Sequence, residues 1–283
     1  MKTPLAILFA LLSLQCSGED APRVSPGDRA ALERYLAHAR EHRFAALPLA
    51  RRVAETGRFF LGLPYRGGTL DGEGPERLVV NLREVDCVTF VDNVLALALL
   101  ASYDEESLPR FLENLRRVRY RDGKILDYTS RLHYSTDWLF EMQRQGILRD
   151  CTPGEGSVPF TNRVNYLSRH YLSRAPLAAD PALVARVVAI EEKINAREKR
   201  HLPKERVESR AGHLQEGDIV LITTGREGLD TAHLGIAVEQ EGKIFLLHAS
   251  SDARAVVISR VPLRDYLQAV RHHAGIIVAR TIQ

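Results

Sequence analysis

The sequence predicts an α+β fold in which helices come first and an antiparallel β-sheet comes last. Apolar residues recur at helical spacing in four segments, 28–58, 106–117, 135–146 and 180–200. After Gly217-Asp218 the chain changes to short β-rich runs separated by turn residues, at 219–223, 233–238, 243–248, 255–261 and 275–279. This segregation of helices from strands is typical of a single α+β domain, with the strands arranged as an antiparallel meander.

The composition is that of an ordinary globular protein. The chain has 283 residues, of which 45% are hydrophobic and 27% charged, so it can form one sizeable core or two small ones. The formal net charge of +3 gives no nucleic-acid footprint. We expect no nucleic-acid partner.

Residues 1–20 have the features of a secretory signal. Lys2 is followed by an apolar run over 5–14, too short for the roughly 20 residues that span a bilayer. Cys16 follows Gln15 directly after this run and resembles the lipid-modified cysteine of bacterial lipoproteins, although Gln15 is an uncommon neighbour. Cleavage nearby without lipidation is the alternative. We expect export to the periplasm or cell envelope, with Cys16 as a membrane anchor in an outer-membrane lipoprotein.

Two helices are expected over 28–58, after the Ser25-Pro26-Gly27 break. They contain His38-Ala-Arg-Glu-His42, which matches the H-x-x-E-H zinc pattern of inverted zinc peptidases. A catalytic zinc also needs a third ligand and a pocket, and this segment is Arg-rich and solvated. We therefore interpret it as a packing helix and expect neither a metal nor a cofactor.

Two further segments are expected to support the fold. Residues 61–69 form a turn region rich in Pro and Gly, which brings the backbone close to a neighbour. The helix over 106–117 has Ser107 as its cap and Pro109 in its first turn.

The helix that starts at Ser135 ends near Gly146 and contains the only tryptophan. Trp138 is expected in the core, and Asp137 beside it can contact a ligand.

The stretch 81–100 contains the candidate nucleophile, Cys87, at the start of an apolar helix. Asp86 is a preferred N-cap residue, so Cys87 falls in the first turn. The positive end of the helix dipole and the free N–H groups there predict a thiol pKa below its ordinary value. The alternatives are a small apolar core residue, or a disulfide with Cys151.

A hairpin around Gln240-Glu241-Gly242 brings two histidines together. With Gln240-Glu241 as a two-residue loop, His233 and His248 face each other directly. With Glu241-Gly242 as the loop they are diagonal neighbours on the same face, and only a three-residue loop separates them.

A catalytic thiol needs a base, and the base is usually oriented by a third polar group. We therefore expect Cys87 as nucleophile, His233 as base and His248 as its orienter. The adjacent pair His272-His273 is expected to be exposed and is a weaker candidate.

Four motifs in order resemble the signatures of the NlpC-type, papain-like cysteine hydrolases that cut bacterial cell-wall peptides. They are Gly62-Leu-Pro-Tyr65-Arg-Gly-Gly68, Asp86-Cys87, His233-Leu-Gly-Ile-Ala and Leu247-His248-Ala. From Ser25 to the end, the chain also resembles a branch long catalogued as a domain of unknown function. Its members are similar to N-acetylmuramoyl-L-alanine amidases acting on small muropeptides. The finer motifs of this branch are 79–90, Asp137-Trp138, Gly228-Leu-Asp230 and His248-Ala-Ser-Ser251.

The resemblance implies a papain-like (NlpC-type) fold for a single domain over 25–283, with N-terminal and inserted helices packed on the C-terminal sheet. It implies the same roles for the thiol and the two histidines, with the backbone N–H of Cys87 completing an oxyanion site near Tyr65. Further candidates for substrate or oxyanion contacts are Asp86, Asp137, Trp138 and Ser250. Val88-Thr89 departs from the usual Ser-Gly after the cysteine.

The implied activity is hydrolysis of the amide bond between the N-acetylmuramoyl lactyl group and L-alanine of a muropeptide. Two alternatives remain open. One is an endopeptidase that cuts between D-glutamate and the diamino acid, and the other is a non-catalytic lipoprotein that binds muropeptides.

Overall fold

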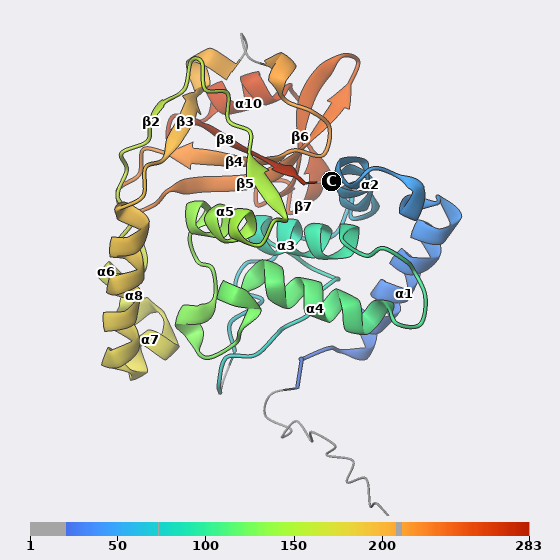
Figure 1. Ribbon diagram of the computed structural model, residues 1–283, viewed down its shortest axis with the longest axis horizontal. Coiled ribbons are helices and arrows are strands. Elements are labelled where there is room, and N and C mark those ends of the chain that lie inside the picture. The colour runs from blue at the N-terminus through green and yellow to red at the C-terminus, as the bar shows by residue number, and fades with distance from the viewer. Residues whose placement is uncertain (1–20, 73, 208–210, 283) are drawn as a thin grey trace, which may run out of the picture.

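The computed structural model describes residues 21–72, 74–207 and 211–282 of the chain (Figure 1). Within these ranges no helix is both long enough and apolar enough to cross a bilayer. The signal segment and Cys16 lie outside the described residues.

The helices of the first half of the chain occur where apolar periodicity predicts them. They are α1 (Pro26–Glu41), α2 (Leu49–Phe59), α3 (Cys87–Ala98), α4 (Ser107–Arg119) and α5 (Ser135–Arg144). Those that follow are α6 (Tyr166–Arg169), α7 (Ala175–Ala179), α8 (Pro181–Asn195) and α10 (Leu263–Ala269). Gly146 has φ +68° just beyond α5, which is the conformation that ends a helix at a glycine.

The described strands form one antiparallel sheet. They are β1 (Leu148–Asp150), β2 (Val158–Pro159), β3 (Arg200–Pro203), β4 (Ile219–Thr224), β5 (Thr231–Gln240), β6 (Lys243–Ser250), β7 (Ala255–Ile258) and β8 (His273–Thr281). Their order is β2-β3-β8-β4-β5-β6-β7, and β1 also pairs with β8. The meander predicted for the last third of the chain is confirmed from β4 to β7, whereas β8 returns to the other side of β4.

Both faces of the sheet are covered. On β4, Ile219 and Leu221 pack into the core shared with α1 to α4, and Val220 and Ile222 pack toward α10. Figure 1 shows the resulting layers, with α10 on one side of the sheet and α3 and then α4 on the other. Because successive strand residues point to opposite faces, a strand buried on both faces must be apolar throughout.

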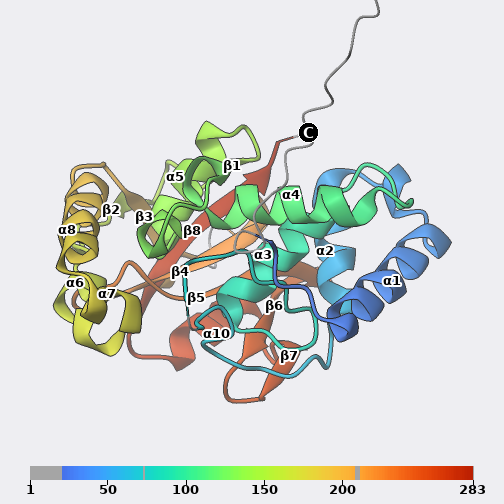
Figure 2. The ribbon, with the colours of Figure 1, turned by 90° about the horizontal axis from the view of Figure 1, so that it is seen from below.

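The remaining helices sit at the two ends of the molecule. Helices α6, α7 and α8 lie together at one end and α1 at the other (Figure 2). A third apolar cluster, which includes Tyr128, Leu177, Val187 and Ile194, holds the α6–α8 group against the segment before α5. The predicted α+β class is therefore confirmed.

Candidate active site

Cys87 is the first residue of α3, and Asp86 caps that helix as predicted. The Asp86 carboxylate accepts a hydrogen bond of 2.8 Å from the backbone N–H of Thr89. The Thr89 hydroxyl accepts one of 2.9 Å from Asp86 N, which completes a capping box. Every side chain from Thr89 to Ala98 is buried, so packing fixes the position of the helix start.

The segment around Tyr65 is fixed beside this helix start by backbone hydrogen bonds. Tyr65 N donates to Arg254 O, and Arg66 N donates to Val85 O, each at 2.9 Å. Burial raises the pKa of the Tyr65 phenol, and the negative charge of a Cys87 thiolate raises it further. The half-buried phenol is therefore part of the surroundings of the thiol.

The thiol of Cys87 lies against the backbone N–H of Leu234 on β5. Burial raises the pKa of the Cys87 thiol to about 12, and the nearby Asp86 carboxylate adds to the rise. The N–H groups of Leu234, Val88 and Cys87 itself lower the pKa, but burial outweighs them. The predicted lowering of the thiol pKa is therefore wrong, and the free protein holds a neutral thiol at pH 7.

The β5–β6 hairpin turns through Glu241 and Gly242, whose φ angles are +50° and +73°. Gln240 pairs with Lys243, so Glu241-Gly242 is the two-residue loop. His233 and His248 are therefore diagonal neighbours on the same face of the sheet. The distance from His233 Nε2 to His248 Nδ1 is 2.7 Å, and the two rings are perpendicular with centroids 4.8 Å apart.

Both imidazoles are neutral at pH 7. Burial, together with the charge of His248, lowers the pKa of His233 to about 3. Burial lowers the pKa of His248 to about 4, although the Asp252 carboxylate opposes this. Since only one proton can lie between two neutral rings, a His233 Nε2–H that donates to His248 leaves His233 Nδ1 unprotonated and able to accept a proton.

Two further aromatic side chains lie near the histidines. The ring of Tyr266, on α10, packs edge-on against His248 at a centroid distance of 5.3 Å, and no local sequence pattern marks it. Burial raises the pKa of Tyr266 to about 12, and the negative charges of Asp252 and of a Cys87 thiolate add to the rise. The ring of His273 is 5.8 Å from that of Tyr266 and is buried, so the prediction of an exposed His272-His273 pair is wrong for His273.

The first turn of α5 is tied to the strand that carries His233. The buried Asp230 carboxylate accepts hydrogen bonds from Thr136 N at 2.7 Å and from Thr136 Oγ1 at 2.8 Å. The hydroxyls of Ser135 and Thr231 are 2.7 Å apart. This clamp fixes the start of β5, and the sequence offers only the short 228–230 motif as a sign of it.

Asp137 and Trp138 follow this clamp but are engaged elsewhere. Each Asp137 oxygen accepts a hydrogen bond of 2.6 Å, from Arg121 and from Arg197. Trp138 is buried in the main core, as expected. Neither residue has a described hydrogen bond or ion pair with the thiol and the two histidines.

Ser250 lies two residues after His248 and shapes the turn that follows β6. Its hydroxyl accepts a hydrogen bond of 3.1 Å from Ala253 N. The same turn provides the Arg254 carbonyl that holds Tyr65, so Ser250 supports the surroundings of the thiol through the backbone.

The remaining candidate cysteine and histidine sites are resolved by their geometry. Cys87 and Cys151 are both free, which excludes the disulfide alternative. The rings of His38 and His42 are 4.0 Å apart. In the part of the chain that the structure describes, no group of three His, Cys, Asp or Glu side chains could hold a metal ion.

Comparisons with known proteins match the chain to an amidase-like family and to solved structures. The family model described as AmiA-like, N-acetylmuramoyl-L-alanine amidase-like, matches residues 55–276. An N-acetylmuramoyl-L-alanine amidase from Bacteroides uniformis is 39% identical, covers 83% of this chain and 99% of its own, and has a TM-score of 0.79.

A Bacteroides fragilis protein that has been suggested to be a xylanase is 38% identical, with coverage of 80% and 99% and a TM-score of 0.76. A Legionella pneumophila protein, 24% identical, covers 90% of this chain and 97% of its own with a TM-score of 0.65, and shares the fold. No match was found among the curated proteins.

Proposed function

This chain belongs to the N-acetylmuramoyl-L-alanine amidase-like family, and we propose that it is a cysteine-dependent peptidoglycan amidase with a papain-like, NlpC-type site. Its reaction is hydrolysis of the amide bond between the lactyl group of N-acetylmuramic acid and L-alanine in muropeptides. The observation that supports this most directly is the 2.7 Å contact between His233 and His248, next to the strand position that touches the Cys87 thiol.

The first half of the reaction is acyl transfer to the thiol. As the sulfur of Cys87 bonds to the lactyl carbonyl carbon, its proton passes to His233 Nδ1. The backbone N–H of Cys87 and the phenol of Tyr65 stabilise the oxyanion that forms. The imidazolium of His233 then gives its proton to the alanine nitrogen, and the C–N bond breaks to release the peptide as an amine.

The second half regenerates the enzyme. Water attacks the thioester carbonyl and loses a proton to His233, and the C–S bond breaks to give the muramic acid carboxylate and the thiol. Because the free site favours neutral thiol and neutral imidazole, proton transfer accompanies attack on the bound substrate and does not precede it. His248 keeps the His233 ring in the tautomer that both steps need.

Digestion of purified muropeptides, followed by mass spectrometry, tests this proposal. The amidase releases a peptide that begins with L-alanine and leaves a sugar with a free lactyl carboxylate. L-Ala-D-Glu retained on the sugar contradicts it and indicates the endopeptidase alternative.

Two cysteine variants separate catalysis from binding. Cys87→Ala is expected to lower turnover by several orders of magnitude with folding retained, as for the nucleophiles of other triads. Cys151→Ala is the matched control, because that cysteine is also half-buried and free. It lies just after β1, where its backbone N–H donates to Val278 O on β8 at 2.7 Å. Absence of turnover in the wild type, with muropeptide binding that Cys87→Ala leaves intact, would favour the non-catalytic binding protein.

The location follows from the first twenty residues. We propose that 1–20 contains a signal peptide, with Cys16 as the lipidated first residue of the mature chain, and that 25–283 is an exported domain in the periplasm or cell envelope. Intact-mass analysis of the mature protein tests this, because a diacylated or triacylated N-terminal cysteine differs in mass from a simply cleaved chain.

A further inference from the structure

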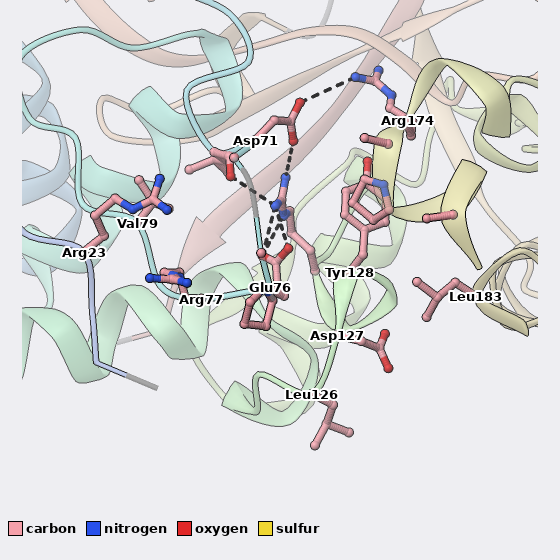
Figure 3. Close-up of a pocket in the computed structure, with 18 of the residues that line it drawn as sticks. Arg23, Asp71, Glu76, Arg77, Val79, Leu126, Asp127, Tyr128, Arg174 and Leu183 are labelled. Carbon is pink, nitrogen blue, oxygen red and sulfur yellow. Dashed lines mark hydrogen bonds and ion pairs between the residues drawn. The ribbon is translucent and has the colours of Figure 1, made fainter. Parts of the chain in front are cut away.

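A large cavity of the described chain lies outside the cluster of Cys87, His233 and His248. Its volume is about 810 Å³, which falls in the usual range for ligand sites. Its lining comes from four parts of the chain: Arg23, residues within 70–72 and 74–79, residues within 126–131, and residues within 173–183 (Figure 3).

Among the described residues, each acidic side chain that lines this cavity has an arginine partner. Glu76 and Asp71 share Arg131, at 2.8 and 3.0 Å. Asp127 pairs with Arg186 at 2.6 Å. Asp71 is also 3.8 Å from Arg174, so three arginines balance these three carboxylates.

Three other arginines line the cavity, and two of them lack such a partner. Arg174 reaches Asp71 at 3.8 Å. Among the described residues, which do not include Glu73, Arg23 and Arg77 have no ion pair and no side-chain hydrogen bond, and Figure 3 shows both on one side of the cavity. Arg77 Nε is fully buried with no acceptor. A buried N–H without an acceptor is costly, so an acceptor supplied by a ligand stabilises it.

Two glycines let the loop backbone pass close to these guanidinium groups. A Cβ on Gly72 would lie 2.9 Å from Arg23 Nη1, and a Cβ on Gly74 would lie 3.4 Å from Arg77 Nη2. Gly72 and Gly74 therefore each lie beside one of the two guanidinium groups on this side of the cavity.

The other side of the cavity mixes apolar and charged side chains. Tyr128 and Leu183 lie there with Arg174 and Asp127, and Leu126 is 80% exposed. A ligand that suits both walls has at least two carboxylates separated by short apolar groups. The stem peptide of peptidoglycan has this character, because its D-glutamate, diamino acid and terminal residue each carry a free carboxylate.

The cavity begins five residues along the chain from the segment beside the thiol. Tyr65 is beside Cys87, and Leu70, five residues further along the chain, lines the cavity. Five residues span at most about 18 Å, and four extended residues of a stem peptide span about 13 Å.

We propose that this cavity binds the stem peptide of the muropeptide, with Arg77 and Arg23 as ligands to its carboxylates. The identity of the peptide rests on the proposed amidase function. The arginine wall then selects substrates that carry an acidic peptide beyond the L-alanine at the scissile bond.

Isothermal titration calorimetry tests this with the Cys87→Ala protein and the tripeptide L-alanyl-γ-D-glutamyl-meso-diaminopimelate. A matched probe has the same sequence with its carboxylates converted to carboxamides. Arg77→Gln and the Arg23→Gln/Arg77→Gln pair are each expected to weaken binding of the acidic tripeptide by about tenfold or more. Arg34→Gln, an exposed arginine on α1 without a described partner, is the control and leaves the affinity unchanged.

The neutral probe distinguishes carboxylate binding from loss of structure. It should bind the Cys87→Ala protein at least tenfold more weakly than the acidic peptide and lose nothing more in Arg77→Gln. If Arg77→Gln lowers the melting temperature, Arg77→Lys and the neutral probe give the same test on a folded chain. Equal affinity for the two probes, no measurable binding of the acidic peptide, or unchanged affinity in the double variant overturns the proposal.

The result is separable from that of the proposed function. If the wild-type protein hydrolyses no muropeptide but the acidic peptide still binds in an Arg77-dependent way, the amidase proposal fails and the site stands. If muropeptides are hydrolysed and the ratio of kcat/KM for N-acetylmuramoyl-tripeptide to that for N-acetylmuramoyl-L-alanine is unchanged in the double variant, the site fails and the amidase stands.

Discussion

Replacing His248 tests whether the histidine pair orients the base. The Nε2–Nδ1 contact of 2.7 Å is partly buried, and His248 itself is 3% exposed. In His248→Ala the N–H of His233 loses its acceptor, a loss worth about 1–3 kcal/mol. If this free energy is lost from the transition state, kcat/KM falls by about 5- to 150-fold. Because the Asn oxygen can occupy the position of the lost nitrogen, His248→Asn should retain activity within about tenfold of the wild type.

The pH dependence distinguishes orientation from a general loss of structure. The charge of His248 helps to lower the pKa of His233, so its removal raises that pKa. Neutral His233 is the active form, and the acidic limb of kcat/KM should therefore move to higher pH in His248→Ala.

The assay is steady-state hydrolysis of a defined muropeptide from about pH 2.5 to about pH 9, a range that includes the pKa of His233, with the melting temperature of each variant measured alongside. His42→Ala, at an exposed histidine just after α1, is the control. Activity of His248→Ala within twofold of wild type, or equal losses in the Ala and Asn variants with no shift of the acidic limb, would refute the proposed role.

Three further predictions concern the surroundings of the thiol. The pKa of the buried His248 is lowered to about 4, so its contribution to stability is present above pH 6.5 and is lost as pH falls toward 4. The free energy of unfolding by urea should be about 2 kcal/mol smaller at pH 5 than at pH 7 because of this group alone, and His248→Asn should lack that part of the change. Asp86→Asn keeps a capping side chain but removes a charge that raises the pKa of Cys87. Alkylation of Cys87 by iodoacetamide at pH 8, followed by mass spectrometry, should therefore be about threefold faster or more in this variant. An unchanged alkylation rate would count against this. Asp230→Ala leaves two donors of Thr136 without their acceptor and should lower the free energy of unfolding by about 2 kcal/mol. The value of kcat/KM should fall as well. A melting temperature equal to that of the wild type would show that the clamp is unimportant.

Local sequence signals predicted the parts of the site that local physics controls. The Asp86 cap depends on residues three apart, and the histidine pair depends on strand periodicity and on a two-residue turn, so both could be read from the sequence. The choice between the two hairpin registers could not, because Gln240-Glu241 and Glu241-Gly242 both suit such a turn. The positive φ of Glu241 and Gly242 decides it.

Long-range burial explains what the sequence could not predict. The thiol pKa was predicted to fall because only the helix start is visible in the sequence, whereas strand β5 and Tyr65, which bury the thiol, come from distant segments. Tyr266 and His273 reach the site for the same reason. Strands β1 to β3 were missed because they have only two to four residues each, too few to show a period.

Trapping the acyl-enzyme tests the role of Cys87 most directly. The wild-type protein is mixed rapidly with a muropeptide, quenched in acid within milliseconds to seconds, and analysed by intact-mass and peptide-mass spectrometry. The proposed mechanism predicts a transient N-acetylmuramoyl adduct on the peptide that contains Cys87, formed together with an equal amount of peptide beginning with L-alanine. Release of that peptide at full rate from Cys87→Ala, or an adduct that maps to any other residue, would contradict it.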